Sequence, residues 1–205
     1  MTSMIPRQWS AVPISSVCEG IFDGPHATPP PANFGPIFLG IKNITEDGHL
    51  DLDEVRHIAS EDFEAWTRRV EPRSGDIVFS YEATLNRYAI IPDGFHGCLG
   101  RRMALIRPDV SKVDCRYLHQ YFFSPAWRSV VRRYTISGAT VDRLPLTKFP
   151  DFPVCLPPLA DQRRIAGILS VYNELIENCD QRTRLLDEMA RALYRECFGS
   201  RSSSA

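Results

Sequence analysis

The sequence predicts an α/β (α+β) chain in which one globular domain precedes one long C-terminal helix. The first 155 residues hold short apolar segments separated by turns rich in Gly and Pro, as is typical of strands. From Asp161 to Phe198 there is no proline and a single glycine, and apolar residues recur at helical spacing. These observations predict a domain over 1–155, a helical segment over 156–199 and a disordered tail over 200–205.

The N-terminal part begins with a loosely alternating segment, Trp9–Cys18, which predicts a short strand. The next segment, 21–31, contains Asp-Gly-Pro and a triple proline, so we expect an ordered loop there. Its polar side chains lie on stiff backbone and suit contacts with base edges or phosphates, although a purely structural turn is the alternative. The candidates are His26, Thr28 and Asn33.

A buried strand is predicted over Pro36–Ile44, and its polar end supplies Lys42 and Asn43 as further candidate contacts. Asp47-Gly48 predicts a turn, and Ser60 is expected to cap a short helix.

The middle of the sequence predicts a turn at Gly75 and a strand over 77–80, followed by a loop over 81–87. A loop at a strand end is a common place for binding residues. The candidates in this loop are Tyr81, Asn86 and Arg87. Two further strands, over 88–91 and 97–107, follow, and Arg101 is expected on an exposed face of the second.

Two helices are predicted next, one over 115–123 capped by Asp114 and one that begins at Ser124-Pro125. The second has an apolar face and carries Arg128, Arg132 and Arg133 on or beside the other face, for which a solvated surface is the alternative interpretation. Arg132 and Arg133 are the candidate contacts. A small-residue turn over 137–140 precedes the final strand, 149–156, and its backbone with Thr140 suits a phosphate.

The helix after Pro157-Pro158 has a wide apolar stripe at heptad positions a, d and e, counted from Ile165 as position a. At about 1.5 Å per residue it would span roughly 57 Å, more than a domain of this size covers. We therefore expect the stripe to contact a second chain, the alternative being a helix packed along its own domain. The stripe residues are Ile165, Ile168, Leu169, Tyr172, Leu175, Ile176, Leu186, Met189 and Leu193.

The net charge of −1 conceals an uneven distribution along the chain. Residues 72–148 carry twelve basic and six acidic groups, whereas residues 1–71 carry five and eleven. The middle third is therefore the part that can supply the local positive potential that DNA binding requires.

Six scattered cysteines include no C-x-x-C pair, which gives no zinc or redox motif and favours free thiols in a reducing compartment. No apolar run approaches the roughly 20 residues that span a bilayer, and the first ten residues lack the apolar core of a signal peptide. We expect a cytoplasmic protein with no membrane contact and no metal site.

The segment Leu156–Leu169 (LPPLADQRRIAGIL) resembles the "PPLxEQxxIAxIL" block of the specificity subunits of Type I restriction–modification systems, with Asp161 in place of the usual Glu. Weaker resemblances lie at 23–29 ("DGPHxTP"), 73–80 and 101–108. The resemblance implies a DNA target-recognition domain around a curved, mainly antiparallel sheet, followed by a spacer helix.

Catalytic motifs are missing from the sequence. It contains no G-x-x-x-x-G-K-[ST] and no N-P-P-[FY], the motifs of P-loop ATPases and adenine methyltransferases. We therefore expect a non-catalytic subunit without a cofactor, and a small metal-dependent nuclease is the alternative.

Full-length specificity subunits contain two recognition domains, each of which reads half of a bipartite site in double-stranded DNA, and they dock methyltransferase and, through it, restriction subunits. One domain is present here, so the resemblance implies a half-subunit that forms a homodimer through antiparallel C-terminal helices. Gly199 and the Ser-rich tail favour a natural end. The alternatives are a fragment of a two-domain subunit and a recognition subunit attached to a fused nuclease–methyltransferase.

Overall fold

The computed structural model describes residues 9–138 and 140–198, and it divides into one compact unit that ends at Arg164 and a second that begins at Ile165. The predicted tail over 200–205 and the predicted end at Gly199 lie outside the described residues.

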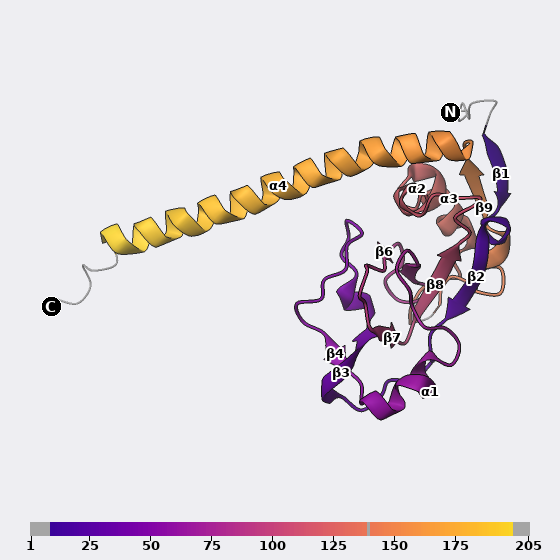
Figure 1. Ribbon diagram of the computed structural model, residues 1–205, viewed down its shortest axis with the longest axis horizontal. Helices are drawn as coiled ribbons and strands as arrows, with labels where there is room; N and C mark the ends of the chain where they lie inside the picture. The colour runs from indigo at the N-terminus through magenta and orange to yellow at the C-terminus, as the bar shows by residue number, and fades with distance from the viewer. Residues whose placement is uncertain (1–8, 139, 199–205) are drawn as a thin grey trace. The chain divides into compact units, whose positions relative to one another are not determined.

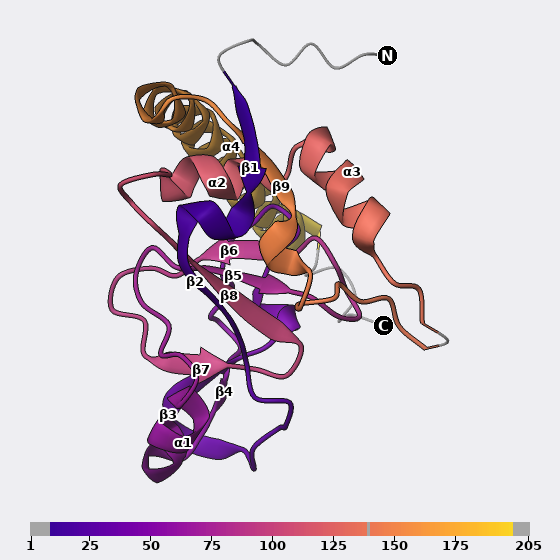
Figure 2. The ribbon, with the colours of Figure 1, turned by 90° about the vertical axis from the view of Figure 1, so that its right-hand side faces the viewer.

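The strands of the first unit form three sheets (Figure 2). The two-stranded sheet pairs β1 (Ser10–Pro13) with β9 (Pro153–Leu156). The four-stranded sheet has the antiparallel order β2 (Cys18–Asp23), β8 (Met103–Pro108), β5 (Ile77–Ser80) and β6 (Tyr88–Ile90). The three-stranded sheet has the order β4 (Arg56–His57), β3 (Ala32–Leu39) and β7 (Gly97–Leu99), with β3 and β7 parallel.

The predicted α+β class with mainly antiparallel strands and a long C-terminal helix is confirmed. The shorter helices are α1 (Phe63–Thr67), α2 (Cys115–Tyr121) and α3 (Pro125–Tyr134). In Figure 2 the three-stranded sheet and α1 lie at one end of the unit and α2 and α3 at the other, with the four-stranded sheet between them. Single 3₁₀ turns occupy Ile14–Val17, Ile41–Asn43, Ser60–Asp62 and Phe149–Asp151.

The predicted helix caps at Asp114 and Ser124 are confirmed, because each side chain accepts a hydrogen bond from the backbone amide three residues later. The predicted cap at Ser60 is wrong, since this residue lies inside a 3₁₀ turn and its side chain caps nothing.

Several predicted strand boundaries are also wrong. The strand expected over 97–107 is two strands in different sheets, because the chain turns at 100–102 with Arg102 at φ 71°. The strand expected over 36–44 ends at Leu39, and the one expected over 149–156 begins only at Pro153. The loop expected from residue 21 begins after Asp23, because 21–23 pair with β8.

Strands β5 and β8 supply the centre of the core. All four residues of β5 and all but Arg107 of β8 are buried, so these strands carry continuous apolar runs rather than an alternating pattern. On one side of them lies an aromatic cluster in which adjacent ring centroids are 4.7–6.2 Å apart. Its members are Phe79, Tyr88, Phe122, Trp127, Phe149 and Phe152.

Gln162 connects the first turn of α4 (Leu159–Phe198) to α2 within the first unit. Its side chain is 1% exposed, its Oε1 accepts from the Asp114 amide at 2.9 Å, and its Nε2 donates to the Pro157 carbonyl at 2.9 Å. The Gln of the motif block is therefore a buried polar residue whose hydrogen bonds are satisfied by backbone.

The part of α4 in the second unit is helical throughout, and α4 is one continuous helix of 40 residues (Figure 1). None of the helices in the described part of the chain is long and apolar enough to cross a membrane. Ile165 is half-buried, and the other predicted stripe residues are exposed by 36–65% of their surface. These are Ile168, Leu169, Tyr172, Leu175, Ile176, Leu186, Met189 and Leu193.

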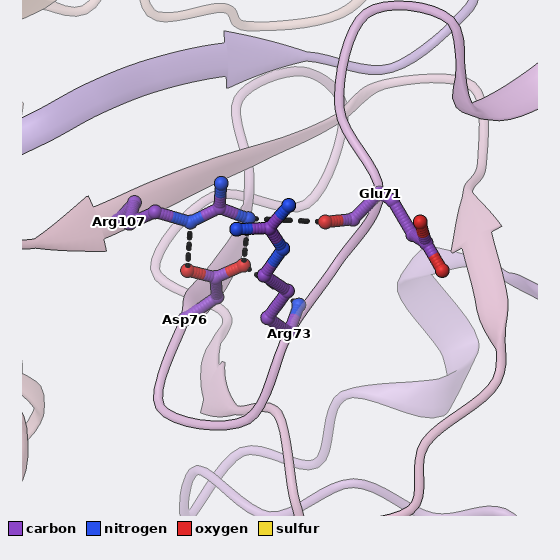
Figure 3. A network of polar contacts seen from close by, with 4 residues as sticks. All are labelled: Glu71, Arg73, Asp76 and Arg107. Atoms are coloured by element: carbon purple, nitrogen blue, oxygen red, sulfur yellow. Dashed lines mark hydrogen bonds and ion pairs between the residues drawn. The ribbon is translucent and has the colours of Figure 1, made fainter.

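An ion pair fixes the turn before β5 to β8 (Figure 3). Arg107 donates from Nε to Asp76 Oδ1 at 2.9 Å and from Nη2 to Asp76 Oδ2 at 2.8 Å, and Nη2 also donates to the Glu71 carbonyl at 3.0 Å. The Asp76 carboxylate also accepts from the Arg73 amide at 2.8 Å. The bond to Asp76 raises the pKa of Arg107. Only 3% of the Asp76 side chain is exposed. These contacts therefore replace the hydrogen bonds that its carboxylate would make to water in the unfolded chain.

We predict that Asp76→Ala lowers the free energy of unfolding by about 3 kcal/mol, because Arg107 loses the partner that compensates its charge. Urea unfolding of the full chain measures the change. Glu71→Gln is the matched control, since only the backbone carbonyl of Glu71 takes part and its side chain points away from the network (Figure 3). Equal stability of Asp76→Ala and the control would contradict this role.

Candidate nucleic-acid interface

The loop over 81–87, between β5 and β6, is held in an unusual backbone conformation. Within the described residues, the non-glycine residues with positive φ are Ala83 (70°) and Asn86 (62°) in this loop and Arg102 (71°) beside it. Left-handed backbone costs such residues about 1–3 kcal/mol and concentrates at binding sites.

Neighbouring backbone holds this loop in place. The Ala83 amide donates to the Asp142 carbonyl at 3.0 Å, and the Leu144 amide donates to the Tyr81 carbonyl at 2.7 Å. The Ser80 hydroxyl donates to the Thr84 carbonyl inside the loop. Hydrogen bonds from two directions therefore fix a strained loop that projects from the end of a buried strand.

On one side of the loop lies a cleft of about 720 Å³, which we name the α3 cleft. Arg128 and Arg132 line it from α3, and Asn86 lines it from the loop. The Asn86 side-chain oxygen is buried without a hydrogen-bond partner among the described residues. The described residues that line it are Ala83, Thr84, Leu85, Asn86, Arg128, Val131, Arg132, Thr135, Ser137 and Asp142.

On the other side lies a second cleft of about 600 Å³, which we name the turn cleft because the 3₁₀ turn over Ile41–Asn43 and the turn after it form one wall. It shares Ala83 and Thr84 with the α3 cleft, so the loop separates the two. Its charged lining residues are Lys42, Glu46, Arg87 and Arg102.

Carboxylates contact both arginines of the turn cleft. Arg87 Nη2 donates to Glu46 Oε1 at 2.6 Å, and Arg102 Nε lies 3.3 Å from Glu82 Oε1. The Arg87 side chain is 19% exposed, whereas that of Glu46 is 88% exposed.

One buried hydrogen bond positions α3 relative to the loop. Trp127 Nε1 donates to the Tyr88 hydroxyl at 2.8 Å, and both side chains are fully buried. Burial raises the pKa of Tyr88, which keeps its hydroxyl neutral. Tyr88 directly follows the loop and Trp127 directly precedes Arg128, so this bond connects the two walls of the α3 cleft.

His26 belongs to a polar group with Asp23 and Tyr81. Its Nε2 lies 3.0 Å from Asp23 Oδ2, and its Nδ1 lies 3.2 Å from the Tyr81 hydroxyl. Arg69 also contacts Asp23, at 2.7 Å. Tyr81 is buried, and desolvation followed by the nearby carboxylates Asp23 and Glu82 raises its pKa. Tyr81 therefore orients His26 rather than presenting its own ring to a ligand.

The structure gathers Lys42, Asn86, Arg87 and Arg132 around the two clefts. It removes Asn43 from the candidate contacts, because this residue is 2% exposed and its side chain bonds the Gly40 amide and the carbonyls of Asp51 and Glu54. The remaining candidates are exposed but line neither cleft: Thr28, Asn33, Arg101, Arg133 and Thr140.

Arg102 lines the turn cleft and was not a sequence-predicted contact. Arg128 was placed on the basic face of its helix but not among the candidate contacts, although its spacing of four residues from Arg132 puts both on one face. No sequence signal marks Arg102, because a non-glycine residue with positive φ cannot be recognised from its neighbours. No group of three His, Cys, Asp or Glu side chains suited to a metal ion occurs within 9–138 and 140–198.

Comparisons with known proteins agree with this fold. Residues 37–186 match the family model described as the Type I restriction modification DNA specificity domain. A putative type I restriction enzyme MjaX specificity subunit of Methanocaldococcus jannaschii is 24% identical over 95% of this chain and 46% of its own length. A putative type I specificity subunit, S.HindORF215P, of Haemophilus influenzae is 25% identical over 67% of this chain and 34% of its own length.

Two solved structures share the fold at low identity. The HsdS subunit from Thermoanaerobacter tengcongensis aligns with a TM-score of 0.66 and 18% identity, over all of this chain and 53% of that one. The type I restriction-modification S subunit from M. genitalium aligns with a TM-score of 0.59 and 14% identity, over 99% of this chain and 48% of that one.

Fold and comparisons together define a DNA-specificity protein of the restriction–modification class. The chain belongs to the Type I restriction modification DNA specificity domain family, and it contains one recognition domain. It spans about half or less of the length of the curated relatives that it matches.

We predict that Tyr88→Phe destabilises the chain by about 1–3 kcal/mol, because it leaves the buried Trp127 indole N–H without an acceptor. Urea unfolding measures this change. Tyr134→Phe is the control, since its ring stacks on Phe152 while its hydroxyl has no hydrogen-bond partner among the described residues. If both variants lose the same stability, the bond does not hold α3 in place.

Proposed function

We propose that this chain is a non-catalytic, sequence-specific DNA-binding subunit of a Type I restriction–modification system. In this proposal its recognition domain reads one half of a bipartite site in double-stranded DNA. The observation that carries the proposal is the strained loop over 81–87 between two clefts lined by five basic side chains. The family membership supports it.

The loop and the arginines have different proposed roles. Lys42, Arg128 and Arg132 contact phosphates and fix the register, whereas the loop over 81–87 contacts base edges. His26, Thr28, Asn33, Arg101, Arg133 and Thr140 are proposed flanking contacts.

Selection from a random duplex pool followed by affinity measurement tests DNA reading. We predict that the chain enriches one motif, and that Arg128→Gln and Arg132→Gln each weaken binding about 10-fold. Each should also lower the salt slope by about one unit, because one phosphate contact is lost. Arg116→Gln, an exposed arginine on α2, is the control with the same charge change. If Arg116→Gln lowers the DNA affinity as much as the two cleft variants do, the DNA interface is not localised at the α3 cleft.

The exposed stripe on the second unit supports a proposed homodimer through antiparallel C-terminal helices. Leu175, Leu186 and Met189 are each more than half exposed within this chain, and a helix face of this kind is normally covered by a partner. Val171 and Leu185 extend the exposed apolar surface beside the a, d and e positions, which leaves area for a second partner. We propose that this partner is the methyltransferase subunit, which connects the chain to a restriction subunit.

Two-fold symmetry in such a dimer would give a site with palindromic halves. A cytoplasmic location follows from this role and is part of the proposal. In the alternative, a single chain pairs its helix with another specificity chain, and the site is asymmetric.

We predict that the double variant Leu175→Glu/Leu186→Glu is monomeric in light scattering whereas the unaltered chain is a dimer, because charges at the helix seam are desolvated on pairing. Arg184→Glu, on the opposite side of the heptad, is the control and should remain a dimer. A monomeric unaltered chain would contradict the homodimer and favour pairing with a different specificity chain.

A further inference from the structure

We infer that Glu46 is a specificity-determining residue that accepts a hydrogen bond from an exocyclic amino group of cytosine or adenine. The inference rests on the proposed function, because it requires that the turn cleft face DNA. It adds an acidic group, which opposes phosphate binding, to a cleft whose other charged side chains are basic.

The first observation is the position of the carboxylate. Glu46 lines the turn cleft with three basic side chains, Lys42, Arg87 and Arg102, yet its own side chain is 88% exposed. An acidic group at the rim of a basic cleft repels the phosphates that the cleft attracts. Such a group weakens binding to every duplex unless it has a specific partner in the correct one.

The second observation is that Glu46 is held in place. Its Oε1 accepts from Arg87 Nη2 at 2.6 Å, and only Oε1 is engaged in this bond. Arg87 is 19% exposed, so the guanidinium is a largely buried support rather than a free phosphate contact. Arg87 therefore acts as a positioning residue that aims the carboxylate.

The third observation is that the turn carrying Glu46 is firmly bonded. The Thr45 amide donates to the His49 carbonyl at 3.0 Å, and the His49 amide donates to Thr45 Oγ1 at 2.9 Å. Gly48, at φ 96°, lies against His119 and Phe123 so closely that a Cβ atom would meet them at 2.6–2.9 Å. The acceptor is thus fixed before any ligand arrives, which lowers the entropic cost of using it.

The chemistry of the grooves then limits what Glu46 can accept from. A carboxylate has acceptor atoms only, and in the major groove the donors are the N4 amino group of cytosine and the N6 amino group of adenine. Phosphate oxygens, guanine O6 and N7 and thymine O4 are all acceptors and are rejected. Glu46 would therefore favour one amino-bearing base and disfavour non-specific binding through the same charge.

The test uses the full chain and the motif that it enriches from a random duplex pool. Affinities are measured for that motif, for its single-base variants and for an unrelated duplex. For Glu46→Gln we expect the preference for cytosine or adenine at one position to fall on the order of 10-fold, with tighter binding to the unrelated duplex. Arg87→Gln should reduce the base preference at the same position of the motif, whereas Lys42→Gln should weaken binding to all sequences equally.

Glu54→Gln is the matched control, because it removes the same charge from an exposed side chain that does not line the turn cleft. If Glu46→Gln retains the preference at every position, the inference is wrong while the proposed function stands. If the unaltered chain enriches no motif, the proposed function and the inference both fail.

Discussion

The hydrogen bond between Trp127 and Tyr88 is the interaction on which the geometry of the clefts depends. It lies inside an aromatic cluster that excludes water, where an unpaired indole N–H or hydroxyl would be costly. Because Tyr88 begins β6 and Trp127 lies in the first turn of α3, the bond fixes the helix to the strand at one point. Arg128 and Arg132 then face the loop over 81–87 as a consequence of core packing.

A second constraint makes the strained loop possible. Ala83 and Asn86 adopt left-handed backbone, and such residues persist only where the surroundings determine their conformation. The loop projects from β5, which is fully buried and is paired with β8 and β6 on its two sides. The ion pair between Asp76 and Arg107 fixes the other end of β5 to β8. The rigid strand therefore supports an irregular loop that has no core of its own, an arrangement that suits recognition.

The sequence was informative where local chemistry determines structure, and uninformative where tertiary pairing does. The caps at Asp114 and Ser124 and the uninterrupted helix after Pro158 follow from residues a few positions apart, and the structure has them as predicted. The separation of 97–107 into two strands depends on which sheet each half joins, and no local pattern records that choice.

The candidate contacts show the same division. Loop 81–87 could be located because one predicted strand ends before it and another begins after it, but the neighbours of each of its side chains could not be predicted. Asn43 has the composition of a surface contact, and only the fold shows that backbone groups from 40–54 consume its hydrogen bonds. Arg102 and Glu46 are unremarkable in sequence, and their positions at the turn cleft follow from a meeting of segments more than 30 residues apart.

The central claim is that the two clefts and the loop between them form the surface that contacts DNA. Photo-crosslinking of the chain to an enriched duplex that carries 5-iodouracil, with mass spectrometry of the crosslinked peptides, tests it most directly. The account predicts crosslinks within 41–46, 81–88 and 125–137. Crosslinks confined to the β1–β9 sheet or to α1, with none in those segments, would contradict it.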